Sequence, residues 1–422
     1  MAPLHHPLRR SAFITHNALL LCAAAALSAA GPAHAGLGYD EALRLARERS
    51  PALLAQQHAL GGAQAQQPAA GTLPDPRLSV GVENLPIGGP DRYTLTRDFM
   101  TMQRIAVMQE VPNAPKRAAR VAGAQARIER ERTLLAVAEL AVKRDAALAW
   151  VALYYAQARA AQLAELLREN QLLQDTLDSR IANGKAMPAD RSMARQDALM
   201  LADRQDDLQR DIAKARASLR RWVGARADEP MDGAPPTIQI TPDQTRADMH
   251  RHAEIAPYAP MQAMARAEAS EADAEQRGDW AWELAYQRRG AQYGDMLSFQ
   301  LTFDLPWNRD QLQRPQLAAK LKDVERIEAE REDTMRKHRE ELDAQLAELQ
   351  ALDTQRARLE AQGLPLATER INLQMASYQA GRSDLGAVLT ARRDAVELRL
   401  RLLDLDAQRT ALRVRLTTLI AE

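Results

Sequence analysis

The sequence of 422 residues has one cysteine, few aromatic residues and no excess of either charge. Cys22 lies in an apolar segment near the N-terminus, so a chain cleaved after that segment can form neither disulfides nor thiolate metal sites. Lysine and arginine together number 56, as do aspartate and glutamate, which removes the electrostatic reason to expect a nucleic-acid partner. Aromatic residues make up only 4%, while alanine, leucine, arginine, glutamine and glutamate dominate, a composition typical of long helices or coiled coils.

Catalytic motifs and long apolar runs are also missing. The sequence contains no phosphate-binding loop, no Gly-x-Ser-x-Gly elbow and no His-Glu-x-x-His pair, so it predicts neither an enzyme nor a bound cofactor. Beyond the N-terminal segment no apolar run approaches eighteen residues, so the sequence predicts no transmembrane helix there. Membrane-spanning strands leave a much weaker signal in a sequence, and they are not excluded.

Residues 1–35 are predicted to be a cleavable signal peptide. Arg9 and Arg10 form the basic region, residues 18–30 form an apolar run too short to span a bilayer, and Ala33-His34-Ala35 matches the small-x-small cleavage pattern. We therefore expect export from the cytoplasm and a mature chain that begins near Gly36. Leu21 stands before Cys22 where a lipoprotein signal has a small residue, which argues against lipidation.

The remainder of the chain repeats itself. The pattern predicts the same order of elements twice, in residues 36–224 and again in residues 251–422: a helix, a β-hairpin, a very long helix, a turn and a further helix. Residues 225–250 are expected to form a linker between the two repeats. Strands are expected at about 76–84 and 102–111 in the first repeat and at about 280–287 and 297–305 in the second. Turns at the far end of the helices are expected at about 182–189 and 379–384. The second long helix, from about 317 to 378, should be kinked or broken at Gly363 and Pro365.

The predicted strands have one apolar and one polar face. In the stretch LSFQLTFDL (297–305), leucine and phenylalanine alternate with serine, glutamine, threonine and aspartate. Alternation of this kind fits a soluble sheet that covers a core, and it also fits a membrane barrel whose apolar face meets lipid. Four strands cannot close a useful barrel, and open sheet edges are not tolerated in lipid, so a membrane barrel would need strands from several chains.

The sequence resembles the TolC-type outer-membrane efflux proteins over nearly the whole mature chain. The resemblance is carried by the following segments: Tyr39–Leu43, Ser50–Leu53, the hairpin exits Val111-Pro112 and Leu305-Pro306, and the tip segments Ser179–Leu199 and Ser377–Val396. Within that family, Glu83–Arg117 and Leu305–Gln311 resemble the heavy-metal efflux branch of cobalt-zinc-cadmium and copper-silver type.

The resemblance implies a mainly α fold with a small β part, built as two tandem repeats. It implies a homotrimer in which each protomer contributes four strands to one twelve-stranded outer-membrane β-barrel, continued by a periplasmic α-helical barrel. The implied function is that of a passive duct that exports heavy-metal cations, in contact with outer-membrane lipid, a periplasmic adaptor protein and an inner-membrane proton-driven pump.

The resemblance also assigns candidate residues at the two tip turns. Gly184 and Gly381 match the tip glycines of the family by position, and Asp190 and Asp384 lie where polar residues control closure or docking. The residues after the glycines are basic here, Lys185 and Arg382, where the family often has an apolar or small residue. The alternative interpretation is turn chemistry alone, with glycine in a left-handed turn and aspartate as a helix cap.

Other features give weaker signals. Met102 and Met108 share a predicted strand face and could be ligands for a soft metal, although methionine is more often a packing residue. His250 and His252 are interpreted as surface residues. A periplasmic adaptor or a coiled-coil scaffold of an efflux assembly is the alternative function. An adaptor would have a single helical hairpin, whereas here both repeats carry a strand hairpin, and a scaffold leaves the apolar strand faces unexplained.

Overall fold

The computed structural model describes residues 36–184 and 186–419. The predicted signal peptide, Cys22 and Lys185 lie outside these residues. The α-helices are α2 (Tyr39–Arg49), α3 (Pro51–Gln66), α4 (Ala114–Ala182), α5 (Pro188–Val223), α6 (Pro242–Ala247), α7 (Tyr258–Ala274), α8 (Gln313–Arg358), α9 (Leu364–Gln379) and α10 (Leu385–Thr417). The strands are β1 (Arg77–Glu83), β2 (Met102–Val111), β3 (Trp280–Arg288) and β4 (Met296–Phe303). Short helices are η1 (Gln67–Gly71), η2 (Gly224–Asp228), η3 (Asp248–Arg251) and η4 (Glu275–Arg277), and η5 (Leu359–Gly363) is a π-helical turn.

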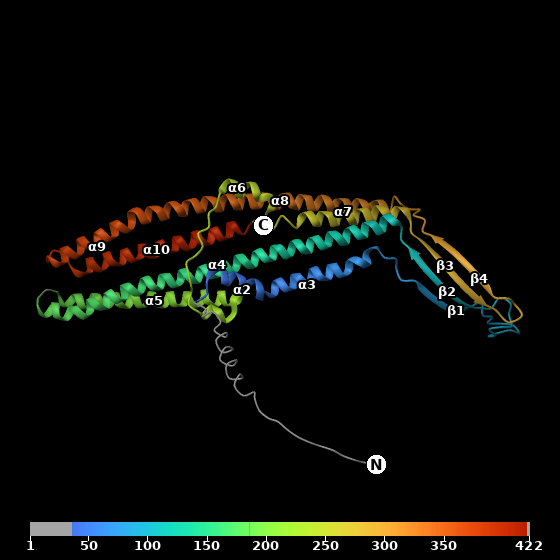
Figure 1. Ribbon diagram of the computed structural model, residues 1–422, viewed down its shortest axis with the longest axis horizontal. Coiled ribbons are helices and arrows are strands. Elements are labelled where there is room, and N and C mark those ends of the chain that lie inside the picture. Colours follow the sequence, from blue (N-terminus) through green and yellow to red (C-terminus); the bar gives the residue numbers. More distant parts are fainter. Residues whose placement is uncertain (1–35, 185, 420–422) are drawn as a thin grey trace, which may run out of the picture.

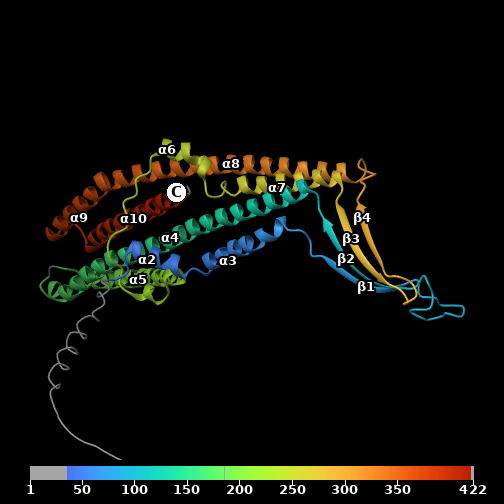
Figure 2. The same cartoon turned by 45° about the vertical axis from the view of Figure 1, so that its right-hand side comes forward.

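The molecule is an elongated rod with its β-sheet at one end and its two helical turns at the other (Figures 1 and 2). Helices α3 and α7 run from the middle of the rod to the sheet, α4 runs from the sheet to the opposite end, and α7 packs between α4 and α8. The α4–α5 and α9–α10 hairpins extend in the opposite direction and end close together. Among residues 36–184 and 186–419, no helix has both the length and the apolar character that crossing a membrane requires.

The four strands form one antiparallel sheet in the order β1-β2-β3-β4. Its two hairpins, β1–β2 and β3–β4, come from the two halves of the chain and are joined by pairing of β2 with β3. Val107 therefore lies between Leu78 and Leu284, and Leu284 lies between Val107 and Phe299. This register places the apolar residues of all four strands on the same face of the sheet.

The first long helix, α4, has clear start and stop signals. The side-chain Oδ1 of Asn113 accepts a hydrogen bond of 2.9 Å from the N–H of Lys116, and Pro115 occupies the first turn. The helix continues for 69 residues, about 100 Å at 1.5 Å per residue, until Asn183 and Gly184 end it. A helix of this length is stabilised by packing along its side, here against α5, α7, α10, α3 and α2.

The core consists of clusters distributed along the rod. In the middle, Trp150 is fully buried against Leu37, Leu153 and Leu219, and its indole N–H donates to the carbonyl oxygen of Leu37 over 3.1 Å. Closer to the tips, Leu163, Leu166 and Leu177 of α4 are buried, and Leu173 is partly buried. The clusters join α4 and α5 to α10, which holds the two halves of the chain together.

The second long helix is not broken at Gly363 and Pro365, and its regular α-helical geometry is interrupted there by a π-helical turn. It remains helical through Gly363 and Pro365, with the π-helical turn η5 between α8 and α9. Proline cannot donate the backbone hydrogen bond of an ordinary α-helical turn, and the wider π turn absorbs this missing bond without interrupting the helix. The expected linker at 225–250 also contains helical structure, because η2, α6 and most of η3 fall within it.

Strand β4 ends two residues before the predicted end at Leu305. The N–H of Asp304 donates to the carbonyl oxygen of Asp279 over 2.8 Å, at the beginning of β3. Pro306 has no N–H to continue the ladder, so the chain leaves the sheet here. Asp279 also accepts a hydrogen bond of 2.9 Å from the N–H of Asn113, which ties the end of β2 to the start of β3.

Candidate functional site

The sheet has its apolar face exposed, and its polar face is buried at the centre and exposed at outer-strand residues such as Ser79 and Gln300. On the apolar face Val80, Leu297 and Phe299 expose 73%, 70% and 65% of their surface. On the opposite face Ala106 and Ala285 are buried. A sheet that covers a soluble core has the reverse arrangement, with its apolar residues inside. An exposed apolar face that crosses four strands indicates a surface that meets another apolar phase.

Charged residues of the polar face are paired with one another. Arg104 on β2 forms ion pairs with Glu83 on β1, at 3.3 Å, and with Glu283 on β3. Arg77 and Glu110 form a further pair between β1 and β2, at 3.0 Å. These cross-strand pairs balance charge along the polar face, so the glutamates there are not a set of free carboxylates.

The two candidate methionines lie on this polar face but far apart. Met102 pairs with Glu83 at one end of β2, and Met108 lies between Arg77 and Glu283. Six residues of strand separate them, roughly 20 Å at 3.3 Å per residue, so they cannot bind the same ion within one chain. In the part of the chain that the structure describes, no group of three or more histidine, cysteine, aspartate or glutamate residues could hold a metal ion.

Aromatic residues gather where the sheet meets the helices. Trp280 pairs with Phe303, and Trp282 is placed two residues further along β3 on the same face. Trp307, just after β4, is 92% exposed. Tryptophan combines an apolar body with a polar N–H and is enriched where hydrocarbon meets water. The apolar face therefore has an aromatic border on its helical side.

The predicted tip glycines both occupy left-handed turns. Gly184 has φ +67° at the end of α4, and Gly381 has φ +71° at the end of α9. A Cβ added at either glycine would meet nothing within 4 Å, so backbone conformation and not space favours glycine there. The side chain of Arg382 is exposed. The backbone N–H of Arg382 donates to the carbonyl oxygen of Ser377 over 2.9 Å.

The predicted tip aspartates both cap helices, but in different surroundings. Asp384 is the exposed N-cap of α10, and its Oδ1 accepts a hydrogen bond of 2.8 Å from the N–H of Ala387. Asp190 lies in the first turn of α5, and its Oδ2 accepts a hydrogen bond of 2.9 Å from the N–H of Met187. Asp190 is only 4% exposed, so its carboxylate belongs to the packed interior of the tip.

Two residues beside the tips did not emerge from the sequence. The guanidinium of Arg180 lies 5.3 Å from the ring centre of Tyr378, which joins the α4–α5 tip to the α9–α10 tip. Burial and the nearby Asp190 raise the pKa of the Tyr378 hydroxyl above its ordinary value. An aromatic residue three positions before the turn glycine was visible in the sequence, but its partner on the other hairpin was not.

Comparison with known proteins gives a match to solved structures only. No family model and no curated protein matches the chain. A membrane protein from Pseudomonas aeruginosa matches with a TM-score of 0.77 and 18% identity over 90% of this chain and 92% of that one. CusC, whose structures concern folding and transmembrane channel formation, matches with a TM-score of 0.74 and 15% identity over 91% of this chain and 92% of that one. The outer membrane protein VceC from Vibrio cholerae matches at 0.74 with 19% identity, over 90% and 95%.

The chain has the fold of these membrane proteins. At identities below 20% the likeness establishes the arrangement of helices and strands, and it extends over nearly all of the described residues. The likeness does not single out a heavy-metal branch.

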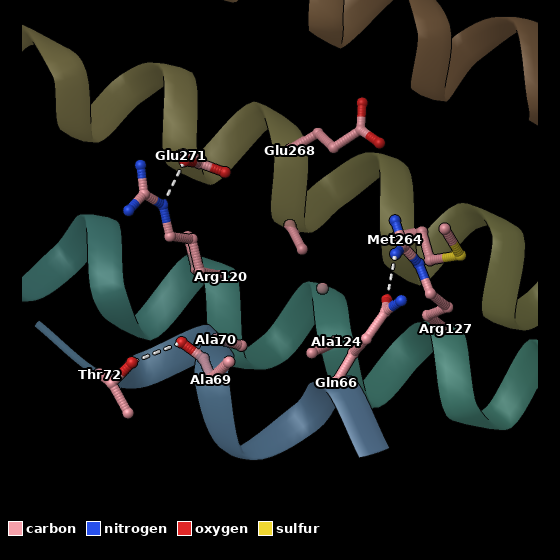
Figure 3. Close-up of a pocket in the computed structure, with 13 residues that line it drawn as sticks. Gln66, Ala69, Ala70, Thr72, Arg120, Ala124, Arg127, Met264, Glu268 and Glu271 are labelled. Atoms are coloured by element: carbon pink, nitrogen blue, oxygen red, sulfur yellow. Dashed lines mark hydrogen bonds and ion pairs between the residues drawn. The ribbon is translucent and has the colours of Figure 1, made fainter. Parts of the chain in front are cut away.

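The helical part of the chain also contains an open groove of 460 Å³ between α3, η1, α4 and α7 (Figure 3). Six of its thirteen lining residues are alanine or glycine. Its charged groups already have partners: Arg120 donates to Glu271 over 2.7 Å, Arg127 to Gln66 over 3.3 Å, and Glu268 accepts from Lys320 over 2.7 Å. We therefore interpret the groove as a gap in helix packing below the sheet.

Proposed function

We propose that the mature chain is the outer-membrane channel component of a tripartite efflux system. The proposal rests on the β-sheet, because its apolar face is exposed and its polar face holds paired charges. In a membrane barrel the apolar face meets lipid and the polar face lines an aqueous channel. The signal peptide proposed for residues 1–35 would deliver the chain to that membrane.

Strands from three chains would close the barrel. Within one chain β1 and β4 are the edges of a four-stranded sheet, and each edge leaves backbone N–H and C=O groups unpaired. Such edges cannot remain open in hydrocarbon. A homotrimer of twelve strands pairs β1 of one protomer with β4 of the next, and three rods side by side then form the periplasmic α-helical barrel. We regard residues 36–224 and 251–422 as its two structural repeats, joined by 225–250.

The tips would be the docking end of the duct. They lie at the end of the rod opposite the sheet, about one long helix away (Figure 1). We assign contact with a periplasmic adaptor and an inner-membrane proton-driven pump to the tip turns, with Gly184, Lys185, Asp190, Gly381, Arg382 and Asp384 as the docking or closure residues. The duct itself would be passive, and its partner pump would supply the energy.

For the substrate we propose heavy-metal cations. Support comes from the resemblance of Glu83–Arg117 and Leu305–Gln311 to the metal-efflux branch. The polar face adds acidic residues, although Arg104 and Arg77 neutralise several of them. Loss of the chain should raise the cellular content of a divalent or monovalent heavy metal. An unchanged metal content with a raised content of organic compounds would refute this substrate class.

The native mass of the chain, extracted in mild detergent from separated outer membranes, tests the duct. A trimer in that fraction is expected, because a single sheet cannot satisfy its own edges in lipid. Recovery of a soluble monomer from the periplasm would refute the duct, and an adaptor or coiled-coil scaffold would then be the better interpretation.

A further inference from the structure

A pair of buried histidines lies in the middle of the rod, away from both the sheet and the tips. The rings of His252 and His338 are stacked, with centres 4.1 Å apart and planes at 22°. His252 is 3% exposed and His338 is 7% exposed, so His252 is not the surface residue that the sequence suggests. His338 belongs to α8, whereas His252 follows η3 in the segment that connects the two halves of the chain.

We call this segment, residues 229–257, the strap. It runs from the end of η2 to the start of α7, and its helix α6 lies on the outside of α8 (Figures 1 and 2). Met249 and Ile255 of the strap are buried in a cluster with leucines of α8 and α10. The N–H of Ala253 donates to the carbonyl oxygen of Leu419 over 2.9 Å, at the end of α10. The histidine stack lies among these contacts.

Both ring nitrogens of His338 face carboxylates. Its Nδ1 lies 3.0 Å from Glu341 Oε2, within hydrogen-bonding geometry. Its Nε2 lies 3.0 Å from Glu254 Oε2, but the angle between these atoms does not allow a hydrogen bond. A neutral imidazole has only one N–H, so only one of the two carboxylates can accept a hydrogen bond from a neutral His338 ring.

His252 is held in the neutral form by its contacts. Its Nδ1 accepts a hydrogen bond of 3.2 Å from the N–H of Glu254, which requires an unprotonated nitrogen. Its Nε2 is buried and finds no partner among the described residues. A proton added at Nδ1 would break the Glu254 bond and place a positive charge 4.1 Å from the centre of the His338 ring, whose electrostatic effect on a charged His252 is unfavourable.

We propose that the stacked His252–His338 pair is an acid-sensitive latch that fastens the strap to α8 and releases it when the surroundings of the chain become acidic. Three titratable groups face His252: His338 and Glu341 from α8, and Glu254 from the strap itself. Just beyond the end of α10, the carbonyl oxygen of Leu419 accepts the N–H of Ala253 from the strap. The latch would operate in the chain whether or not the chain forms a duct.

The direction of the pH effect follows from the same contacts. Burial, and then the charge of His338, lower the pKa of His252 from 6.5 to about 4. In the closed state the strap is fastened to α8, and the pKa of His252 is lower there than in the released strap. His252 therefore favours the closed state fully above pH 6.5, and this stabilisation is lost as the pH falls towards 4. Between pH 8 and pH 5 the equilibrium for opening the strap should rise about 30-fold.

Hydrogen–deuterium exchange of the purified chain in detergent tests the latch. Peptides covering residues 248–258 are compared between the wild type and His252→Phe at the same pH, because intrinsic exchange rates then cancel. Phenylalanine keeps an aromatic ring on His338 but cannot be protonated. We expect the wild type to lose protection between pH 8 and pH 5 and the variant to retain it. His250→Phe is the matched control, because His250 is exposed and its Nδ1 lies 3.0 Å from the carbonyl oxygen of Ala247 at the end of α6. This variant should follow the wild type.

Three outcomes would overturn the latch. Equal loss of protection in the wild type and in His252→Phe would assign the effect to the carboxylates, and no loss in the wild type would exclude release. Deprotection by EDTA at pH 8 would mean that a bound metal, and not a proton, controls the stack.

A second measurement needs no variant. Deuterium exchange at the imidazole C2 position reports the titration of each histidine in the wild type. His252 should titrate well below the ordinary histidine pKa of 6.5, and titration at that ordinary value would also overturn the latch.

Discussion

Asp384 allows a structural role and a docking role to be separated at a single residue. Its carboxylate caps α10 through Ala387, and its side chain is exposed. We predict that Asp384→Ala costs about 1 kcal/mol locally, which makes amide exchange in the first turn of α10 about fivefold faster. Hydrogen–deuterium exchange of peptides from α10 measures this change.

Asp384→Asn is the matched control, because asparagine caps equally well without a charge. If the asparagine variant keeps the helix protected but export fails, the negative charge itself is needed at the tip. Normal exchange in Asp384→Ala would contradict the capping role.

Local chemistry explains why some single residues could be predicted and others could not. Gly184, Gly381 and Asp384 follow from turn and cap preferences that act within four residues of the chain. The burial of His252 depends on α8, and the contact of Tyr378 depends on Arg180 in the other hairpin. No periodicity in the sequence reports contacts between segments so far apart.

The two faces of β4 give a prediction at the scale of the element. Phe299 lies on the exposed apolar face opposite Leu284, whereas the adjacent Gln300 lies on the polar face opposite Glu283. We predict that Phe299→Arg prevents trimers from accumulating in the outer membrane, because a cation on a lipid-facing strand costs roughly 2–4 kcal/mol near the bilayer midplane. Semi-native electrophoresis of outer-membrane fractions measures the trimer.

Gln300→Arg supplies the control, since it adds the same charge one residue away and places it near Glu283. It should leave assembly intact. Equal tolerance of both substitutions would mean that the apolar face does not meet lipid.

Element boundaries followed the sequence where a side chain or a proline sets them. Asn113 and Pro115 start α4, and Pro306 precludes a longer β4. The sequence did not predict the π turn at Leu359–Gly363 or the short helices of the strap. A π turn reflects how the helix accommodates Pro365 while it packs against α10, and short helices gain their stability from tertiary contacts such as Arg246 with Asp343, at 2.9 Å.

At the scale of the whole molecule, the alternation of apolar and polar residues along the strands fits both a soluble sheet and a membrane sheet. Apolar residues on one face are expected both in a soluble sheet and in a membrane sheet. Only the three-dimensional arrangement distinguishes them, because it shows that neither α3 nor α7 folds back over the apolar face (Figure 2). The helices continue away from the sheet instead and leave that face uncovered.

The placement of the rod in a bilayer can be measured with its own tryptophans. Trp150 is buried in the helical core and Trp222 is half-buried there, whereas Trp280, Trp282 and Trp307 lie at the helical border of the sheet. We predict that lipids brominated on their acyl chains quench the fluorescence of the reconstituted protein. A variant with phenylalanine at all three border positions should lose this quenching.

Single replacements in the same bilayers give the depth of each tryptophan. Trp282 lies two residues further along β3 than Trp280, so bromine deeper in the acyl chain should quench Trp282 more by a displacement of about 6–7 Å along the strand. Trp307 lies beyond the strand and should respond most to shallow bromine. Quenching that persists when all three are phenylalanine would place the helical core in the lipid, and the sheet would then not be the membrane-facing part of the molecule.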